Sequence, residues 1–277
     1  MKKVFTRSLY FAVFGIFAAM LFLLSGCKTK QSKTESDPIF EAIPGTKEEI
    51  IQELSGYPIP NSYEVTKLIY ESGAPFILSL ANPPEKAENY ITEKDKILNL
   101  GVYATDLVYA TTYMMKQATL NYLEASKTLI DDLGISTTFN LTYAERIENN
   151  MNDRDSLIMI VSESFSDTWN HLVENQQDIL ARLVVCGSWI EGIYITSNVA
   201  LKAKDNSEFL EMLAKQSNSL DRMVSMLEPV KDEDEVSNIY KALFELQDLY
   251  TNVGEALTSA QLDEIAAKVN SLRAEII

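Results

Sequence analysis

The stretch VSNIYKALFELQDLYTNV, residues 236–253, decides the fold. Its apolar residues recur at spacings of three and four, which is the period of an α-helix with one face turned toward a core. The same spacing marks residues 209–227 before it and 262–276 after it. Strand-like alternation, and the Asn-Gly or Asp-Gly pairs typical of hairpin turns, are missing from the sequence. The sequence therefore predicts an all-α protein.

Proline is distributed unevenly along the chain. Of the eight prolines, only Pro229 lies after residue 85. Because proline breaks helix interiors, we expect residues 38–84 to be a proline-rich segment of short helices packed on the body. Residues 85–277 are expected to form one all-helical domain. The architecture predicted is an irregular bundle of about nine to ten mostly antiparallel helices, with stacked helical hairpins as the alternative.

Helix ends carry their own signals. The pairs Thr142/Glu145 and Thr258/Gln261 have the spacing of a capping box, which satisfies free amides of a first helical turn. Glycine takes the left-handed conformation that ends a helix without strain, so Gly73 and Gly134 are expected at helix ends. The expected helices are residues 46–55, 61–72, 85–114, 116–133, 142–151, 154–174, 176–203, 206–228, 232–253 and 258–276.

The N-terminus has the pattern of an export signal. It begins with Lys2, Lys3 and Arg7 and continues as an uncharged, largely apolar stretch over residues 8–25. A basic segment followed by an apolar one directs export, although an apolar run of about 18 residues also suits an uncleaved membrane anchor. The sequence shows no second long apolar run, so we expect the rest of the chain not to span a membrane.

The apolar stretch ends in Leu-Ser-Gly-Cys at residues 24–27. This ending resembles the lipobox of bacterial lipoproteins, in which the cysteine is acylated and becomes the first residue of the mature chain. The resemblance implies that residues 1–26 are a signal peptide, that Cys27 carries the lipid, and that residues 27–37 are a flexible tether.

The body carries a second resemblance. Residues 101–113, with Asn-Tyr-Leu at 121–123 and residues 129–135, resemble a group of uncharacterised helical lipoproteins from Bacteroidota over about residues 95–135. That resemblance implies no known activity. Members bound for the cell surface often carry an acidic run just after the cysteine. Because Lys-Thr-Lys stands at residues 28–30 instead, we expect an outer-membrane anchor facing the periplasm.

Charge narrows the range of partners. The chain has 24 basic and 40 acidic residues, and removal of residues 1–26 would change its formal net charge from −16 to −19. Such an acidic surface repels nucleic acid, so we predict no nucleic-acid partner.

Catalytic and metal-binding patterns are few. His171 is the single histidine, which excludes multi-histidine zinc sites. Cys186 lies in an apolar run, and we interpret it as a buried thiol, with a Cys186/His171 nucleophile and base as the alternative. Glu163 and Asp167 share a helix face, which suits either a solvated surface or acid–base and calcium chemistry. We therefore predict no catalytic residue, no metal and no cofactor.

One aromatic face is distinctive. On a helix, Tyr103, Asp106, Tyr109 and Tyr113 fall on the same side, with one carboxylate among three phenols. A buried tyrosine needs a partner for its hydroxyl, so Asp106 is expected to accept hydrogen bonds from one or two of them. The interpretations are a buried structural network or a patch that lines a ligand.

A stripe of small residues marks the last candidate region. The stripe consists of Ala181, Val185, Ser188, Gly192 and Thr196, with Gly187 nearby. It predicts close approach of a neighbouring helix, or room for a ligand beside Trp189 and Tyr194.

These observations favour a lipoprotein of the outer membrane that serves as a non-enzymatic interaction or accessory module. Its expected partners are the membrane, through the lipid, and a protein of the cell envelope. The alternative is a small-molecule-binding lipoprotein with a pocket lined by tyrosine and tryptophan.

Overall fold

The computed structural model describes residues 62–135 and 137–277. Within these ranges the chain forms ten α-helices, three short 3₁₀ helices and no strand, which confirms the all-α prediction. The predicted helix at 46–55, the signal peptide and Cys27 lie outside the described residues. The α-helices are α2 (Ser62–Glu71), α3 (Glu93–Thr112), α4 (Lys116–Asp132), α5 (Thr137–Asn149), α6 (Arg154–Glu174), α7 (Asp178–Ala200), α8 (Ser207–Lys215), α9 (Ser217–Leu227), α10 (Ser237–Tyr250) and α11 (Ser259–Ile276).

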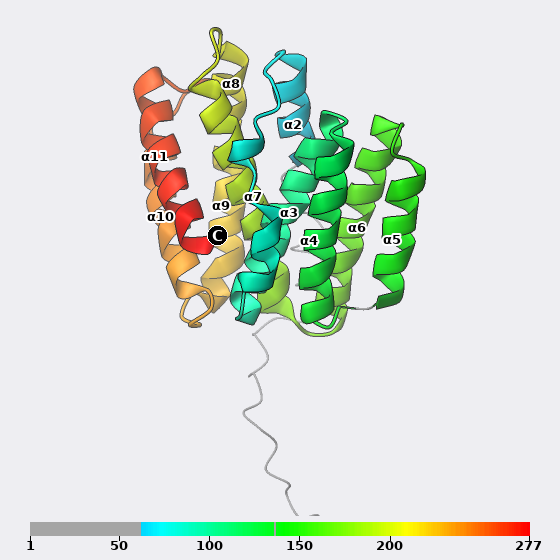
Figure 1. The fold of residues 1–277 in the computed structure, drawn as a ribbon. Coiled ribbons are helices and arrows are strands. Elements are labelled where there is room, and N and C mark those ends of the chain that lie inside the picture. The colour runs from blue at the N-terminus through cyan, green and yellow to red at the C-terminus, as the bar shows by residue number, and fades with distance from the viewer. Residues whose placement is uncertain (1–61, 136) are drawn as a thin grey trace, which may run out of the picture. The chain divides into compact units, whose positions relative to one another are not determined.

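Helices α3 and α7 run through the middle of the body (Figure 1). Helices α4, α5 and α6 lie on one side of this central pair, and α8 to α11 lie on the other. The described part of the proline-rich segment, residues 62–84, consists of α2 and an irregular connection, and α2 packs against the central pair.

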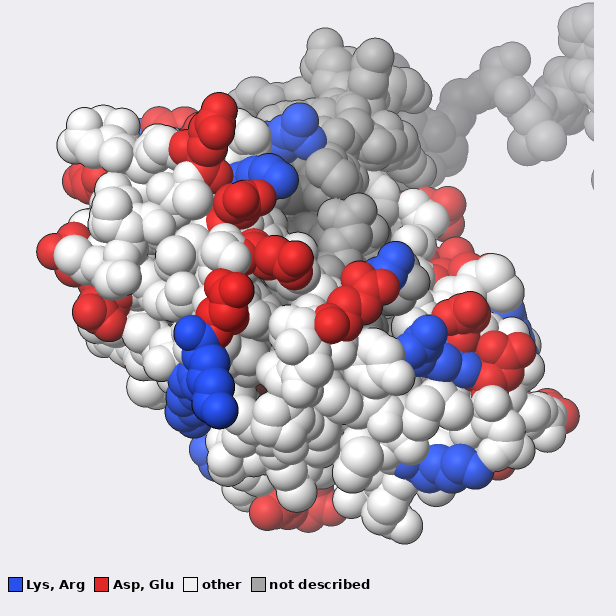
Figure 2. Space-filling view, turned by 90° about the horizontal axis from the view of Figure 1, so that it is seen from above, with Lys and Arg blue, Asp and Glu red and all other residues white. Residues whose placement is uncertain are grey.

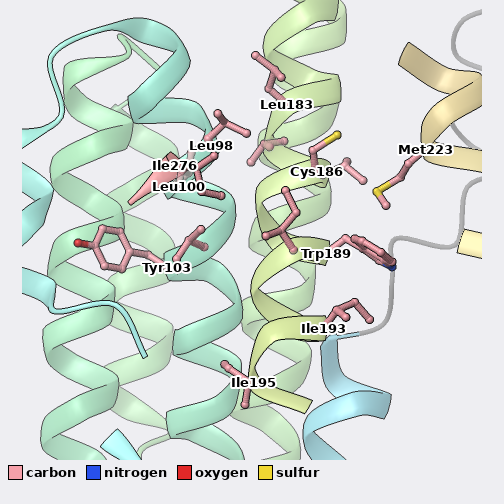
Figure 3. Close-up of a cluster of buried hydrophobic side chains, with 14 of the residues drawn as sticks. Leu98, Leu100, Tyr103, Leu183, Cys186, Trp189, Ile193, Ile195, Met223 and Ile276 are labelled. Carbon is pink, nitrogen blue, oxygen red and sulfur yellow. The ribbon is translucent and has the colours of Figure 1, made fainter. Parts of the chain in front are cut away.

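Helix α7 is apolar on all sides, as expected for a helix that other helices surround. Of its 23 residues, 20 are buried, and an all-round apolar helix is expected only in a core. Cys186 and Trp189 point from α7 toward Met223, whereas Leu98 and Leu100 of α3 lie on the other side of the helix (Figure 3). By length and composition α7 is also apolar enough to cross a membrane, but 89% of its most apolar window is buried inside the body. The expectation of no second apolar run was therefore wrong, and the run is a core helix.

The crossing of α3 and α7 depends on two glycines. A Cβ atom added at Gly187 would lie 2.0 Å from the carbonyl oxygen of Leu98, and one added at Gly101 would lie 2.1 Å from the carbonyl oxygen of Val184. Beside this contact, the Thr105 hydroxyl donates to the carbonyl of Ser188 at 3.0 Å. Only backbone without a side chain fits there, so the two helices touch backbone to backbone.

The prediction that a neighbouring helix approaches closely along the small-residue stripe is thus only partly correct. Gly187 and Ser188 make the close contact, but a Cβ built at Gly192 has no described atom within 4 Å apart from its chain neighbours and the backbone of its own helix. Gly192 was wrongly placed in the contact because helical spacing alone does not reveal which of several small residues meets the neighbouring backbone.

Two helix-end signals agree with the structure and one does not. Thr258 and Gln261 form the predicted capping box at the start of α11. Gly73 and Gly134 take positive φ angles of 74° and 69° where helices stop, as predicted. Thr142 instead lies inside α5. The capping-box prediction there was wrong because the same threonine–glutamate spacing also fits a helix interior.

Two predicted long helices are interrupted. Residues 84–89 form a 3₁₀ helix, and α3 starts only after Thr92, whose hydroxyl accepts the amide N–H of Asp95 at 3.0 Å. The predicted helix 206–228 divides at Gln216 into α8 and α9. Apolar periodicity continues across both breaks, so it does not locate them.

Candidate functional site

Three ionisable side chains meet in the interior of the body. Asp106 of α3 and Glu191 of α7 are 0% exposed, and Arg273 of α11 is 7% exposed. The Arg273 guanidinium binds the Glu191 carboxylate in two places, with Nε 2.5 Å from Oε2 and Nη2 2.8 Å from Oε1. The same Nη2 donates to the carbonyl of Leu80 at 3.0 Å, and the guanidinium lies 3.9 Å from the Tyr194 ring centroid. Nε and Nη2 of Arg273 are therefore bonded to groups of this chain, and the guanidinium lies over an aromatic ring.

Asp106 lies against this pair, and its pKa is raised. Its Oδ2 accepts the amide N–H of Asn82 at 3.0 Å, while Oδ1 has no donor among the described residues. Burial raises the pKa of Asp106 well above its ordinary value, and the negative charge of Glu191 raises it further. Burial also raises the pKa of Glu191, but the hydrogen bonds and charge of Arg273 oppose that rise. We therefore place the proton on Asp106, which donates to an ionised Glu191.

Two buried amides extend the polar cluster. Asn82 Nδ2 donates to the Tyr90 hydroxyl at 2.9 Å and to Asn99 Oδ1 at 3.3 Å. Asn99 Nδ2 donates to the carbonyl of Asp95 at 2.9 Å and to that of Ile276 at 2.5 Å. Through these bonds the connection before α3, helix α3 itself and the end of α11 are fastened together.

The predicted tyrosine face exists, but its hydroxyls do not bond to Asp106. Tyr103 donates to the carbonyl of Pro83 at 2.8 Å, and Tyr113 donates to that of Ala74 at 2.6 Å. Tyr109 accepts the amide N–H of Ile77 at 2.9 Å. The predicted Tyr–Asp hydrogen bonds were wrong because the irregular connection packs its main-chain groups against the tyrosines in a partly buried setting, where these groups need partners, and the tyrosines supply them.

The second aromatic pair is also used inside the body. Trp189 is 1% exposed and its Nε1 donates to Gln216 Oε1 at 3.2 Å. Tyr194 stacks under Arg273. The two residues therefore pack against different neighbours and do not form one ligand-lined surface.

The remaining candidates have ordinary surroundings. Cys186 is 0% exposed, and burial raises its pKa to about 12, so the thiol stays protonated. Glu163 pairs with Arg146 at 2.7 Å, and Asp167 accepts the hydroxyl of Tyr143. In the part of the chain that the structure describes, no group of three or more His, Cys, Asp or Glu side chains is arranged to hold a metal ion.

Sequence reasoning identified Asp106 and missed its partners Glu191 and Arg273. A signal existed for both. Glu191 is the one acidic residue after Asp178 in a long apolar run, and Arg273 stands beside Leu272 on the apolar face of its helix. Ionisable residues in such positions are rarely buried unless paired, so each of them indicates a buried partner without naming it.

A separate cleft lies between α3, α4, α5 and α6 and has a volume of about 50 Å³. Its walls are mostly apolar, and it also includes Ser126 and Lys127 of α4. The aromatic residues predicted to line a ligand do not contribute to this cleft. They are Tyr103, Tyr109, Tyr113, Trp189 and Tyr194.

The buried carboxyl pair makes stability depend on pH, and Asp106→Asn tests this. In the unfolded chain Asp106 ionises near its ordinary pKa of 3.8, whereas the folded pKa is higher. Its contribution to stability is therefore present below pH 3.8 and is lost as the pH rises toward the folded pKa. Asparagine keeps an acceptor for Asn82 and a donor for Glu191 without needing a proton. We expect its stability relative to wild type to increase with pH, by up to about 1.4 kcal/mol per pH unit.

Urea unfolding of both proteins at about pH 5 and about pH 8 measures this difference. Asp106→Ala serves as the comparison, because it leaves Asn82 N–H unpaired and should lower stability by about 1–3 kcal/mol. A difference between wild type and Asp106→Asn that stays constant with pH would contradict the assignment of the proton.

The cluster joins the connection before α3 to helices α3, α7 and α11 in the interior of the body. None of its three ionisable residues is more than 7% exposed, so the cluster organises the body instead of facing a cavity. On the outside, Lys and Arg side chains stand singly or in small groups among acidic ones on the face seen in Figure 2. Comparison of the chain with models of protein families, with characterised proteins and with solved structures finds no match.

Proposed function

We propose that this protein is a lipoprotein of the cell envelope, anchored through Cys27 in the outer membrane on its periplasmic side, whose helical body is a non-enzymatic interaction or accessory module. One observation carries the proposal for the body. The groups best suited to chemistry, Asp106, Glu191 and Arg273, are buried and bound to one another and to the segment around Leu80. These groups stabilise the fold, so we assign the interaction with a partner to the surface of the body.

A second candidate function is the binding of a small molecule. Such a ligand would not be bound by the predicted aromatic residues, because their polar groups form hydrogen bonds within the body. These residues are Tyr103, Tyr109, Tyr113 and Trp189. The observation in favour is the apolar cleft between α3, α4, α5 and α6. Binding would then occur on the opposite side of the central pair from α8 to α11.

The anchor is tested by Cys27→Ser. Without the thiol no lipid can be attached, so we expect the protein to leave the membrane pellet when cells are fractionated in high salt. The other cysteine is the matched control, because Cys186→Ala keeps Cys27 and should stay in the pellet. Mature protein of unchanged size that still pellets with membranes after Cys27→Ser would overturn the anchor.

The same strains test the proposed partner. Crosslinking in cells, followed by affinity purification of the anchored protein, should recover a defined envelope protein. The yield of that protein should fall in Cys27→Ser, which no longer concentrates the body at the membrane. Equal recovery with both forms would show that anchoring does not serve the interaction.

A further inference from the structure

Exposed apolar side chains gather at one end of the body. Among the described residues eight large apolar side chains are exposed, and four of them belong to three neighbouring segments. These segments are the end of α2, the connection after it, and the start of α4 with the turn before it. The four side chains are Tyr70, Leu78, Met115 and Leu120. Single exposed apolar residues are normal on a surface, whereas a gathered set marks a site of interaction with a protein or a membrane.

Contacts between the three segments make this set one surface. The Tyr113 hydroxyl donates to the carbonyl of Ala74 at 2.6 Å, which joins the turn before α4 to the connection. The Tyr113 ring centroid lies 5.4 Å from that of Tyr70 and 5.6 Å from that of Phe76. We call the set the apolar patch, and it consists of Tyr70, Phe76, Leu78, Tyr113, Met115 and Leu120.

Charged side chains of both signs border the apolar patch. Lys116 stands one helical turn before Leu120, and the Arg154 guanidinium lies 4.9 Å from the ring centroid of Tyr70. The acidic residues next to these segments are Glu71, Glu124, Asp153 and Asp155. Mixed charge suits a zwitterionic lipid headgroup, because its phosphate accepts from lysine and arginine and its amine donates to carboxylates. An anionic surface would instead be repelled by a chain of net charge −16.

The proposed anchor keeps a membrane within reach of the apolar patch. The 34 residues between Cys27 and α2, residues 28–61, span at most about 120 Å when fully extended. Attachment over this length gives the body a high effective concentration at the membrane, so that a weak surface contact is enough. Tyr70 lies in α2, the first described helix after residues 28–61, so the apolar patch is close along the chain to the attachment.

The side chains of the apolar patch have the chemistry of a membrane surface. Tyrosine rings are enriched at the level of the headgroups, and leucine and methionine bury apolar area among the first carbons of the acyl chains. Lysine and arginine reach phosphates from an apolar surface. We infer that the body lies with the apolar patch against the zwitterionic headgroups of the membrane in which Cys27 is anchored. This inference rests on the proposed anchor and adds the orientation of the body.

Fluorescence quenching in vesicles tests the inference on the full chain. The protein is purified from cell membranes and reconstituted with phosphatidylethanolamine and phosphatidylcholine, with or without a lipid that carries a doxyl quencher near its headgroup. Met115→Cys carries the environment-sensitive dye NBD. Cys186 stays unlabelled because it is buried and its pKa is raised to about 12, and Cys27 because its thiol holds the lipid. We expect the NBD emission to shift to shorter wavelength and to lose intensity with the doxyl lipid.

The chain offers matched controls for this experiment. Phe244→Cys on α10 places the dye at a residue that is 48% exposed, compared with 42% for Met115, and should show neither the shift nor the quenching. Adding Leu120→Glu to Met115→Cys should abolish the quenching, because a carboxylate does not enter the acyl region. Adding Ile91→Glu should not, because Ile91 precedes the start of α3 whereas Tyr113 follows its end.

The outcomes separate the orientation from the anchor. Vesicles that float with the protein and quench the dye at residue 115 alone support the inference. Flotation without quenching at residue 115, or with equal quenching at residue 244, would overturn the orientation and leave the anchor in place. An emission shift without quenching in isolated cell membranes would show that a protein covers the apolar patch, which also overturns it. A chain that does not float with vesicles would overturn the anchor and the orientation together.

Discussion

Gly187→Ala is expected to destroy the native body or to lower its stability by at least about 3 kcal/mol. The added Cβ would lie 2.0 Å from the carbonyl oxygen of Leu98, a backbone atom inside α3. It cannot move aside as a flexible side chain could, so relief requires the two central helices to separate. Urea unfolding followed by circular dichroism measures the loss.

The same helix offers a matched control in Gly192→Ala. Apart from its chain neighbours and the backbone of its own helix, no described atom lies within 4 Å of a Cβ at that position, and alanine stabilises a helix interior by about 1 kcal/mol relative to glycine. We expect this variant to be more stable than wild type. A Gly187→Ala protein that unfolds at the wild-type urea concentration would show that the backbones of α3 and α7 are farther apart than described.

Arg273→Met is expected to have the second-largest effect. It removes the cation from Glu191 and the donor from the carbonyl of Leu80. Breaking a buried pair by removing one partner costs about 3–5 kcal/mol, because an uncompensated charge is left behind. Thermal unfolding should therefore show a large drop in Tm.

Two variants make that result specific. Arg146→Met breaks the solvent-exposed pair with Glu163, and such pairs contribute at most about 1 kcal/mol. Adding Glu191→Gln to Arg273→Met removes the stranded charge, so the double variant should recover part of the lost stability. A double variant that is no more stable than Arg273→Met alone would contradict the charge explanation.

The fold was predictable where a helix has one buried face. Ile239, Leu243 and Leu246 recur at the helical period because only one side of α10 faces the core, so the pattern identifies the helix. The break before α3 was not predictable in this way. It depends on the hydroxyl of Thr92 and on the extended backbone at Tyr90, which apolar spacing does not record.

The polar cluster was predictable only in part, for a related reason. Asp106 is conspicuous among tyrosines on its own helix, so local spacing identifies it. Its partners lie on α7 and α11, and which carboxylate meets which arginine is decided by how those helices pack. The hydroxyl partners of Tyr103 and Tyr109 were missed for the same reason, because they are main-chain groups of a connection with no periodic pattern.

The bond between Arg273 and Leu80 also bears on when the protein can fold during its synthesis. The two residues are 193 positions apart, and contacts between distant positions form slowly because a long loop must first close. Until Arg273 has left the ribosome, Glu191 lacks its cation, and burying its carboxylate alone is unfavourable. An incomplete chain is therefore expected to complete this part of its core only after α11 has been synthesised.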